Sequence, residues 1–563
     1  MQIKKGLNKL VDRVEKTNIY IIFVVILCIQ VLFMLYYCNM KKGYFVDEIW
    51  SYGLSNSYYH AQLEDNNSLE NVKISSELFK KYLTVDEGKN FKFGSVVNNQ
   101  MHDAHPPLFY MVLHSVSSLF TGTFSKWFGL IPNIIYFVIV MFLLLKISQC
   151  VSDNNIFFIA VQVLYGFSIG AINSVTYIRM YMLLTLWCLL FLLENIYLYQ
   201  KEKLKLSNYI LLGIATLGGM YTHFFFIIFA CPVVLLNLLY LYKEKSGKGL
   251  LKYILTGAIG GISAILLFPT YIQKISGNDG NSNSAQTHAN MRNFSDWSNR
   301  LKAYWADVSS ELFGSVWGVI IGICVIIIIS YIFSRMIFNI KLKKTEKGLI
   351  CIIIEKNDFE KKEIVIRKNV FIIVGILFIC AFYYILVCKI TLFISNRFMM
   401  CIYPLLVLLM CLLLEITVKV CTKKKVKRAF AMGIISILII GVTFYANDPE
   451  YIYEEKGVIA TELENYTDVP CLYVYTAPYR MLNNALNLMN TKTIYQSNLD
   501  NLKKNINSVD NSSEQLILYV DTLVSDQGME MDDCVEYIKS SLNYNKVAKK
   551  DKGHKKNPLF LNK

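Results

Sequence analysis

The chain has 563 residues, of which 54% are hydrophobic, and its mean hydropathy is +0.39. Soluble proteins are roughly 45–50% apolar, so this composition argues against a soluble protein. The net charge of +15 would suit a nucleic-acid-binding protein, but the basic residues form short runs between apolar segments, as at 423–428. That distribution is typical of cytoplasmic loops in a membrane protein, and nucleic acid is therefore not an expected partner.

The apolar runs have the length of membrane spans, since a helix needs roughly 20 residues to cross the hydrocarbon core. The first run follows a basic start and lacks a small-residue cleavage site, so we expect a retained helix rather than a signal peptide. The pattern predicts an all-α polytopic membrane protein of about eleven transmembrane helices, at 18–38, 128–147, 155–173, 181–199, 209–221, 224–242, 253–272, 312–333, 369–388, 398–418 and 429–445.

The basic loops between these spans set the predicted orientation in the cell membrane. Lysine-rich segments such as 335–368 are expected in the cytoplasm, because basic loops stay on that side. The segments 39–127, 273–310 and 447–563 are then extracytoplasmic. The helix at 209–221 is too short to span alone, and we expect it either to continue past its hairpin or to end in a cavity.

Composition changes after residue 446, where a transmembrane module at 1–446 is expected to end. Apolar runs at 471–475 and 515–520, set among polar helical stretches, predict a small extracytoplasmic α/β domain at 447–563. Its Lys-rich end is expected to be disordered. Cys471 and Cys534 both lie in this domain, and the sequence leaves a disulfide between them open.

Two adjacent carboxylates, Asp47 and Glu48, follow the first span near the outer interface. A carboxylate there can take the proton of an acceptor hydroxyl. The pair could instead bind a divalent cation, the one cofactor that the sequence raises. A solvated interfacial pair without function is the alternative.

A histidine precedes paired prolines at His105-Pro106-Pro107, and an amphipathic stretch follows to about Phe120. The prolines stiffen the entry to a short helix, which we expect to lie along the outer interface. His105 would stand at its start, beside Asp103, where it could bind substrate. A structural role is the alternative for this histidine.

Arginine is scarce, with 9 Arg against 48 Lys. Arg179 and Arg397 each stand at the outer end of a predicted helix, where the orientation rule disfavours a cation. Because arginine binds phosphate oxygens in a bidentate manner, both are candidates for a lipid phosphate, with headgroup anchoring as the alternative. Lys389 lies on the same outer loop as Arg397, and His223 lies at the outer tip of a hairpin, where it could line a cavity.

These elements, taken in order, resemble the landmarks of GT-C glycosyltransferases. They are Asp47-Glu48, His105-Pro106-Pro107-Leu108-Phe109-Tyr110, Arg179-Met180-Tyr181, Tyr221-Thr222-His223 and Asn396-Arg397-Phe398. The nearest type is glycosyltransferase family 39, which includes protein O-mannosyltransferases and the aminoarabinose transferase. The resemblance covers about residues 20–420, and the His-Pro-Pro element is its most specific part.

The resemblance implies an inverting transfer from a polyprenyl-phosphate-linked sugar to an acceptor hydroxyl of a glycan, lipid or protein on the extracytoplasmic face. It makes Asp47 the general base with Glu48 beside it, and it makes outer basic residues the ligands of the donor phosphate: His105, Arg179, His223, Lys389 and Arg397. One departure is that family members often carry an acidic residue shortly before the arginine that corresponds to Arg179, whereas residues 174–178 here contain none. Another is that only Pro404 follows Arg397, where relatives have a proline-rich helix.

Two other classes remain open from sequence. An outer-face polysaccharide polymerase or ligase also uses polyprenyl carriers and outer arginines. A flippase or transporter would place charges at the bilayer midplane and often shows an inverted repeat. The predicted midplane segments are nearly free of charge and we find no repeat, which disfavours transport.

Overall fold

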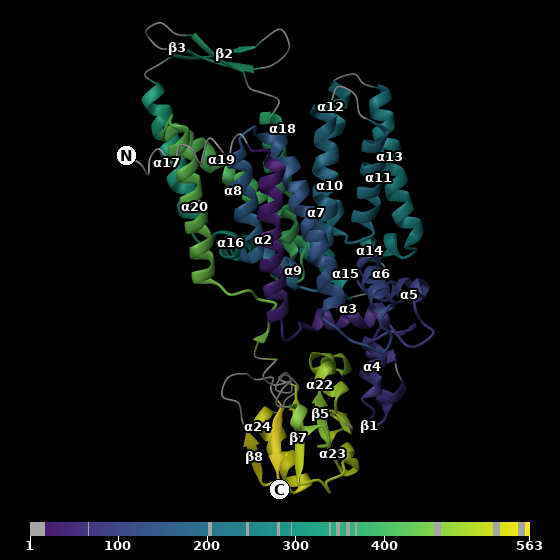
Figure 1. The fold of residues 1–563 in the computed structure, drawn as a ribbon. Helices are drawn as coiled ribbons and strands as arrows, with labels where there is room; N and C mark the ends of the chain where they lie inside the picture. The colour runs from purple at the N-terminus through teal and green to yellow at the C-terminus, as the bar shows by residue number, and fades with distance from the viewer. Residues whose placement is uncertain are drawn as a thin grey trace.

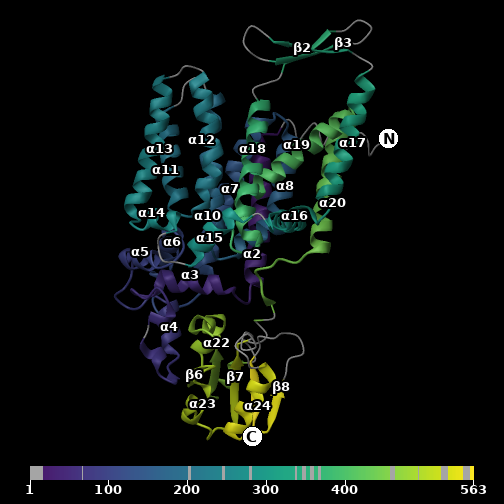
Figure 2. The same ribbon diagram turned by 180° about the vertical axis from the view of Figure 1, so that it is seen from behind.

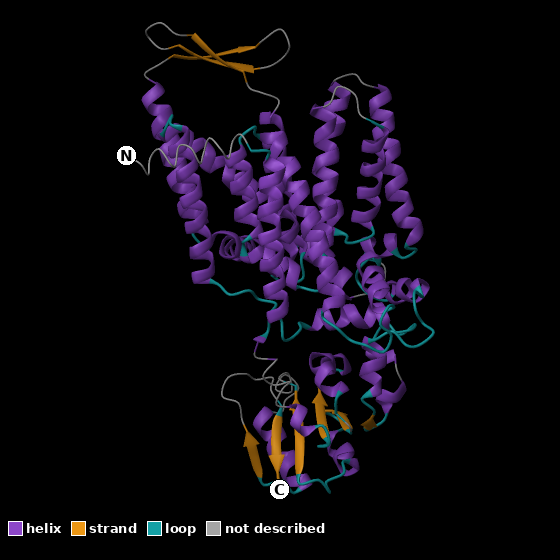
Figure 3. Ribbon diagram, in the orientation of Figure 1, coloured by secondary structure: helices purple, strands orange, loops and turns teal. Residues whose placement is uncertain are grey.

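The computed structural model of the chain shows a bundle of helices with an α/β domain at one end (Figures 1 and 2). Helix dominates, and the strands gather at the two ends of the bundle (Figure 3). The structure describes residues 17–563 except 66, 201–204, 244–246, 278–281, 294, 337–338, 345–349, 356–360, 366–368, 455, 457–462, 492, 522–529 and 550–557. The basic start at 1–16 thus lies outside the described residues.

Within these residues, eight helices are long and apolar enough to cross a membrane, and two bent helix pairs raise that number to ten. The eight are α2 (Ile19–Met40), α7 (Trp127–Val151), α10 (Tyr181–Gln200), α12 (Phe225–Lys243), α13 (Gly247–Leu267), α18 (Asn369–Ile390), α19 (Tyr403–Cys421, preceded by the 3-10 helix η3 at Asn396–Ile402) and α20 (Lys425–Ala446).

The predicted class of polytopic helical membrane protein is therefore confirmed, but the count of eleven spans is not. Every predicted span coincides with a helix or a helix pair. The remaining segment is α11 (Leu206–Met220), which has 15 residues. A helix of that length covers only about 22 Å of a hydrocarbon core about 30 Å thick.

Both bent pairs have a local cause. Between α8 (Asn155–Gly166) and α9 (Ile169–Thr176) the chain turns by 53°, and the Ser168 side chain caps α9 by accepting from the Ala171 amide. Between α16 (Trp297–Phe313) and α17 (Trp317–Met336) the turn is 82°. Gly314 ends α16 with a φ of +58°, and an added Cβ would lie within 3 Å of the α20 backbone, so only glycine fits this corner.

Two predicted outer segments are more helical than expected. The segment 273–310 contains α15 (Ser282–Arg292) and most of α16, and α14 (Tyr271–Ser276) leads into it. The first outer segment folds into α3 (Val46–Asn56), the 3-10 turns η1 (Leu63–Asp65) and η2 (Asn67–Glu70), strand β1 (Lys73–Ile74), α4 (Glu77–Leu83), α5 (Phe93–Met101) and α6 (Leu108–Ser117). Helix α6 is the short helix expected after Pro106-Pro107.

The tail forms a six-stranded sheet with the order β1-β6-β5-β7-β9-β8. Its parallel centre comprises β5 (Cys471–Tyr475), β6 (Ile494–Asn498) and β7 (Gln515–Val520), and β8 (Lys546–Lys549) and β9 (Leu559–Asn562) complete one edge. The helical segments of the tail are η4 (Glu464–Tyr466), η5 (Pro478–Asn484), α22 (Ala485–Met489), α23 (Leu502–Asn505), η6 (Ile506–Ser508) and α24 (Met531–Leu542). The α/β class predicted for the tail is confirmed.

Three details of the tail go beyond the sequence-based predictions. Most of the Lys-rich end, predicted to be disordered, lies at 550–557, outside the described residues, while β9 follows it and pairs antiparallel with β7, with Leu559, Phe560 and Leu561 buried. Cys471 and Cys534 are free and belong to different hydrophobic clusters, so they form no disulfide. The opposite edge strand, β1, comes from the first outer segment, so that segment and the tail share one sheet.

The segments predicted for opposite sides of the membrane lie at opposite ends of the bundle. A second, three-stranded antiparallel sheet of β2 (Asn339–Lys344), β3 (Ile350–Glu355) and β4 (Lys361–Val365) is formed by the predicted cytoplasmic segment 335–368. Figure 1 shows β2 and β3 at the end away from the tail, while α3 to α6 lie at the end next to it.

The shared sheet predicts a specific cross-link. Lys73 of β1 and Tyr495 of β6 are paired directly, and the Cα atoms of such residues lie about 4.5–5.5 Å apart, within disulfide reach. In a cysteine-depleted background, Lys73→Cys with Tyr495→Cys should therefore cross-link under mild oxidation. A protease site inserted at 356–360 would release two fragments that stay joined until reduction.

The control pair is Lys73→Cys with Lys503→Cys, in which the second residue is exposed on α23 and has no strand partner. This pair should not cross-link. Free, maleimide-reactive thiols in the first pair after oxidation would show that the first outer segment and the tail do not share a sheet.

Candidate active site

Helix α3 presents the two predicted carboxylates at the foot of α2. The chain leaves α2 at Met40 and begins α3 at Val46, so Asp47 and Glu48 lie in the first turn of α3. Acidic side chains are favoured there because the first amides of a helix lack partners. Glu48 uses this position directly, since its Oε2 atom accepts from the Phe45 amide at 2.7 Å.

Glu48 is buried and fully engaged. Its carboxylate is 3.0 Å from the Lys41 ammonium group, and both side chains are 0% exposed. Its Oε1 atom also accepts from the Ile178 amide at 2.8 Å. The sequence-based prediction placed Glu48 beside Asp47 as a catalytic group, but the geometry gives it a structural part, because a buried paired carboxylate has no open face for substrate.

Asp47 points the other way, and its side chain is 15% exposed. Its Oδ2 atom forms an ion pair with the Arg397 guanidinium group and accepts from the Tyr177 hydroxyl at 3.3 Å. Asp47 and Arg397 are 350 residues apart in the chain. The structure thus brings the predicted base into contact with the predicted phosphate ligand.

Arg179 approaches the same turn of α3 from the corner between α9 and α10. One terminal nitrogen, Nη1, donates to the Asp47 main-chain oxygen at 3.2 Å, to the Ser51 hydroxyl at 3.2 Å and to the Tyr110 hydroxyl at 3.0 Å. The arginine is only 4% exposed. Arg179 is therefore held inside the protein. The alternative interpretation of the sequence, headgroup anchoring, would require it to lie among lipid headgroups.

Arg397 lies in an aromatic cage at the start of η3. Its guanidinium carbon is 5.5 Å from the ring centre of Phe45, 5.0 Å from that of Phe393 and 5.2 Å from that of Phe398. Its Nη1 atom also donates to the Tyr177 hydroxyl. A cation between aromatic faces is stabilised electrostatically, and here this fixes the guanidinium plane beside Asp47.

Three buried N–H groups near Asp47 have no hydrogen-bond partner among the described residues: Nε of Arg179, Nε of Arg397 and Nε2 of His223. The His223 Nδ1 atom accepts from the Phe225 amide at 3.0 Å, so the proton of the neutral ring is on Nε2. Burial, and then the charges of His105, Arg179 and Arg397, hold the pKa of His223 well below its usual range. These groups are donors that an anion could satisfy.

His105 joins this group through His223, because their ring centres are 5.2 Å apart. The His105 Nδ1 atom is 3.2 Å from the Asp103 carboxylate, which orients the imidazole ring. The Lys274 ammonium group donates to the Asp103 main-chain oxygen and so ties this turn to α14. Four of the predicted basic residues, His105, Arg179, His223 and Arg397, are thus assembled around Asp47.

Lys389 was expected to share a phosphate with Arg397, and in the structure its ammonium group is engaged by the protein. Its ammonium group donates to the Asn293 main-chain oxygen and lies 5.9 Å from the Trp297 ring centre. Lys389 is at the end of α18, and these contacts fasten the segment between α15 and α16 to that helix. The sequence showed its proximity to Arg397 along the loop but not the direction of its side chain.

The residues present do not fit the divalent cation that was considered for Asp47 and Glu48. The two carboxylates leave α3 in different directions, and each is paired with a basic side chain. Among the residues that the structure describes, no group of three His, Cys, Asp or Glu side chains could hold a metal ion. A metal site built on this carboxylate pair would need both ion pairs to open.

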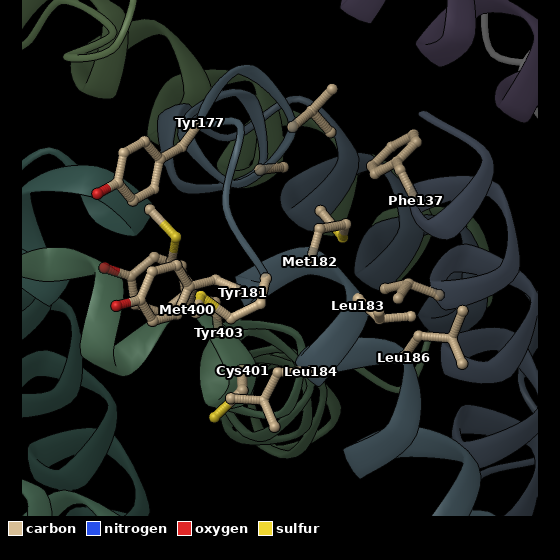
Figure 4. Packing of buried hydrophobic residues seen from close by; sticks show 14 of the residues in the cluster. Phe137, Tyr177, Tyr181, Met182, Leu183, Leu184, Leu186, Met400, Cys401 and Tyr403 are labelled. Atoms are coloured by element: carbon tan, nitrogen blue, oxygen red, sulfur yellow. The ribbon is translucent and has the colours of Figure 1, made fainter. Parts of the chain in front are cut away.

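Several tyrosines of the site were missed by sequence reasoning. Tyr177 and Tyr110 bind the arginines through their hydroxyls, and the Tyr181 ring stacks on Tyr177 at 5.8 Å. In Figure 4 the hydroxyls of Tyr177, Tyr181 and Tyr403 lie on the same side of the buried cluster, away from Leu183 and Leu186. The run Tyr177-Ile178-Arg179-Met180-Tyr181, with tyrosines on both sides of a scarce arginine, was the available signal.

Comparison with known proteins gives a structural likeness only. No protein-family model matches the chain, and no curated protein matches it. Two solved structures of ArnT from Cupriavidus metallidurans, one bound to undecaprenyl phosphate and one in the apo state, are similar to it with TM-scores of 0.48. They are 10% and 9% identical, and the match covers 96% of this chain and 97% of theirs. This likeness concerns the chain course and assigns no activity.

The buried Lys41–Glu48 pair predicts a large stability effect. Lys41→Met leaves the Glu48 carboxylate buried without its cation and should lower the free energy of unfolding by about 3–5 kcal/mol. The double variant Lys41→Met with Glu48→Gln should recover part of this loss, because the neutral side chain needs no cation and its oxygen can still accept from the Phe45 or the Ile178 amide. Thermal unfolding of the purified protein in detergent measures the effect.

The matched control is Lys80→Met. Lys80 pairs with Glu77, but their side chains are 47% and 58% exposed, so the change should be below about 1 kcal/mol. Equal unfolding temperatures for Lys41→Met and the wild type would show that the Lys41–Glu48 ion pair does not contribute to the stability of the protein.

Proposed function

We propose that this protein is an inverting glycosyltransferase that moves a sugar from a polyprenyl-phosphate-linked donor to an acceptor hydroxyl at the extracytoplasmic face of the membrane. The observation that carries the proposal is the arrangement around Asp47. A carboxylate able to act as base lies beside two buried arginines, and both arginines keep an Nε–H group without a partner. A base and phosphate-binding cations are the two parts that such a transfer requires.

The chemistry follows from these positions. The acceptor oxygen forms the new bond to the anomeric carbon as the bond to the phosphate oxygen breaks, and Asp47 receives the acceptor's proton. The departing phosphate keeps the electron pair and gains negative charge, which Arg179 and Arg397 can stabilise. A single displacement inverts the anomeric centre, and no covalent enzyme intermediate is needed.

The geometry of the Asp47–Arg397 ion pair would allow Arg397 to bind a phosphate in addition to Asp47 or in its place. Arg397 uses Nη1 for Asp47 and Tyr177, while its Nε–H points elsewhere without a partner. A phosphate bound at the unused edge would compete with Asp47 for the guanidinium group, and the Asp47 carboxylate would then be free to contact the acceptor hydroxyl. His223 adds a neutral N–H donor, which binds an anion without adding another buried charge.

The position of the site supports an extracytoplasmic lipid phosphate. Arg179 precedes α10 and Arg397 precedes α19, and both contact Asp47 in the first turn of α3. Helix α3 lies at the end of the bundle next to the tail (Figure 2). A lipid phosphate lies at this depth, between hydrocarbon and water. The Lys-rich segment 335–368 lies at the other end, where the orientation rule puts the cytoplasm.

This placement also bears on the competing classes. A flippase or transporter would carry its charged site at the bilayer midplane, and the group around Asp47 is at a bundle end. An outer-face polymerase or ligase would use the same contacts to a lipid phosphate. Its reaction does not explain why a partly exposed carboxylate, Asp47, lies beside the phosphate-binding arginines. The geometry therefore favours transfer with Asp47 as base.

The first prediction from this proposal concerns the base. Asp47→Asn keeps the size of the side chain but cannot take a proton, so turnover should fall at least about a hundredfold. The assay follows release of undecaprenyl phosphate from undecaprenyl-phosphate mannose, glucose, galactose and aminoarabinose, with the cell-envelope fraction as acceptor. Near-normal turnover of Asp47→Asn with any of these donors would remove the base assignment.

Two variants serve as controls for Asp47→Asn. Asp500→Asn changes an exposed carboxylate of the tail and should leave turnover unchanged. Glu48→Gln removes the partner of Lys41, so it should lower the unfolding temperature more than Asp47→Asn does.

The second prediction concerns the phosphate ligand. A lysine at position 397 would restore the charge but neither the planar fork nor the fit between Phe45, Phe393 and Phe398, so Arg397→Lys should lower turnover at least about tenfold. Arg397→Ala should lower it by roughly a hundredfold or more. If the contact strengthens in the transition state, turnover falls more than the affinity for the undecaprenyl-phosphate sugar donor.

Arg292→Lys is the control, because Arg292 is an exposed arginine at the end of α15 in the same outer region. It should behave as the wild type in both turnover and affinity. Wild-type turnover and affinity in Arg397→Lys would mean that Arg397 serves only to hold Asp47 and the aromatic cage.

A further inference from the structure

The segment between α20 and the tail sheet passes through the site before it reaches the tail. We call residues 447–453, which directly follow α20, the strap. In Figure 1 the chain runs from the end of α20 back beneath α2 and then into the tail. The sequence-based prediction placed these residues in the tail, because all the motifs that resemble glycosyltransferase landmarks precede them.

Tyr451 is the centre of the strap and is 2% exposed. Its ring stacks on that of Tyr177, with ring centres 4.1 Å apart and planes 18° apart. Its hydroxyl donates to the Asn396 side-chain oxygen at 2.8 Å, next to Arg397 in the chain. Its main-chain oxygen accepts from Lys41 at 2.6 Å, the same lysine that pairs with Glu48.

The strap is held on both sides of Tyr451. The amides of Lys42 and Gly43 donate to the Ile452 main-chain oxygen at 2.8 and 3.3 Å. On the other side, the Glu450 amide donates to the Asn173 side chain at 2.9 Å. These bonds join the strap to the α2–α3 connection and to α9, so the position of Tyr451 is fixed by the fold.

Tyr177 is the residue through which Tyr451 can act. Its hydroxyl donates to Asp47 and accepts from Arg397, while its ring stacks on two others, with its plane 18° from that of Tyr451 and 10° from that of Tyr181. Stacking on Tyr451, at the shorter ring-centre distance, restricts the orientation of the Tyr177 ring. The position of the Tyr177 hydroxyl, and with it the geometry of the Asp47–Arg397 pair, therefore depends on the Tyr451 ring.

We propose that Tyr451 is a positioning residue for the transfer reaction, acting through Tyr177 and Asn396 on Asp47 and Arg397. The proposal rests on the proposed function, because it assumes that Asp47 and Arg397 are the reacting groups. It assigns residues 447–453 to the active site rather than to the tail. Since displacement of a reacting group by about 1 Å can cost a hundredfold in rate, loss of the stack should be visible in turnover.

The test compares three substitutions in the full-length protein. Tyr451→Phe keeps the stacked ring and loses only the bond to Asn396, so turnover should stay within about fivefold of the wild type. Tyr451→Leu removes the planar face and should lower turnover by roughly thirtyfold to a hundredfold, with the KM for the undecaprenyl-phosphate sugar changed by less than about threefold. Tyr445→Leu, at a 93% exposed position on α20, is the control and should match the wild type.

Near-normal turnover in Tyr451→Phe, beside losses in variants without a ring, would assign the effect to the planar face rather than to the hydroxyl. Tyr451→Met is a second variant without a planar face, with a flexible side chain about as large as that of leucine, and it should lose at least about tenfold in turnover. If Tyr451→Leu does not fold, Tyr451→Met decides the question. Wild-type turnover in either folded variant would overturn the proposal.

A double-variant cycle tests the route through Tyr177. If Tyr451 acts by orienting the Tyr177 ring, then adding Tyr451→Met to Tyr177→Leu should cost less than about threefold more, because the stack is already lost. Fully additive losses would overturn the route. Asp47→Asn is measured in the same assay: an inactive Asp47→Asn with fully active Tyr451 variants contradicts only the strap, whereas an active Asp47→Asn contradicts the proposed base itself.

Discussion

The structure depends on the pairing of two adjacent buried carboxylates with two different cations. Asp47 and Glu48 are neighbours in the chain, and removing either charge from water without a partner would cost several kcal/mol. Glu48 meets Lys41 from the end of α2, and Asp47 meets Arg397 from the start of η3. To satisfy both, α3 must lie across the foot of the bundle, and segments from positions 41, 178, 397 and 451 must converge on its first turn.

Because of these contacts, Glu48 and Asp47 have different surroundings. Glu48 is shielded and takes three contacts from the protein, so its charge is used to hold the α2–α3 corner. Asp47 keeps 15% of its side chain exposed and shares its cation with an aromatic cage and a tyrosine hydroxyl. The same pair of residue types thus yields one fixed ion pair and one that can change partners, because the side chains of successive helical residues point in directions about 100° apart.

The tail is joined to the site by two independent connections. The strap contributes Tyr451 to the aromatic stack at Tyr177. The first outer segment contributes β1 to the tail sheet, and the Gln496 side chain donates to the main-chain oxygens of Leu69 and Asn71. The ring of Trp50 on α3 also lies 5.9 Å from Tyr479 in the tail. The tail therefore packs against the helix that carries Asp47.

The sequence by itself determined the positions of the long apolar helices, the α/β class of the tail and the scarce polar landmarks at helix ends. It could do so because lipid requires long apolar runs, and because Asp47, His105, Arg179 and Arg397 stand out against apolar or lysine-rich surroundings. Only the tertiary structure decided that Glu48 pairs with Lys41, that Lys389 bonds to the Asn293 main chain, that β1 completes the tail sheet, and that Tyr451 stacks on Tyr177. These are matters of side-chain direction and of partners hundreds of residues apart, such as Lys41 and Tyr451, and no local pattern in the sequence encodes which distant group a buried charge or ring will meet.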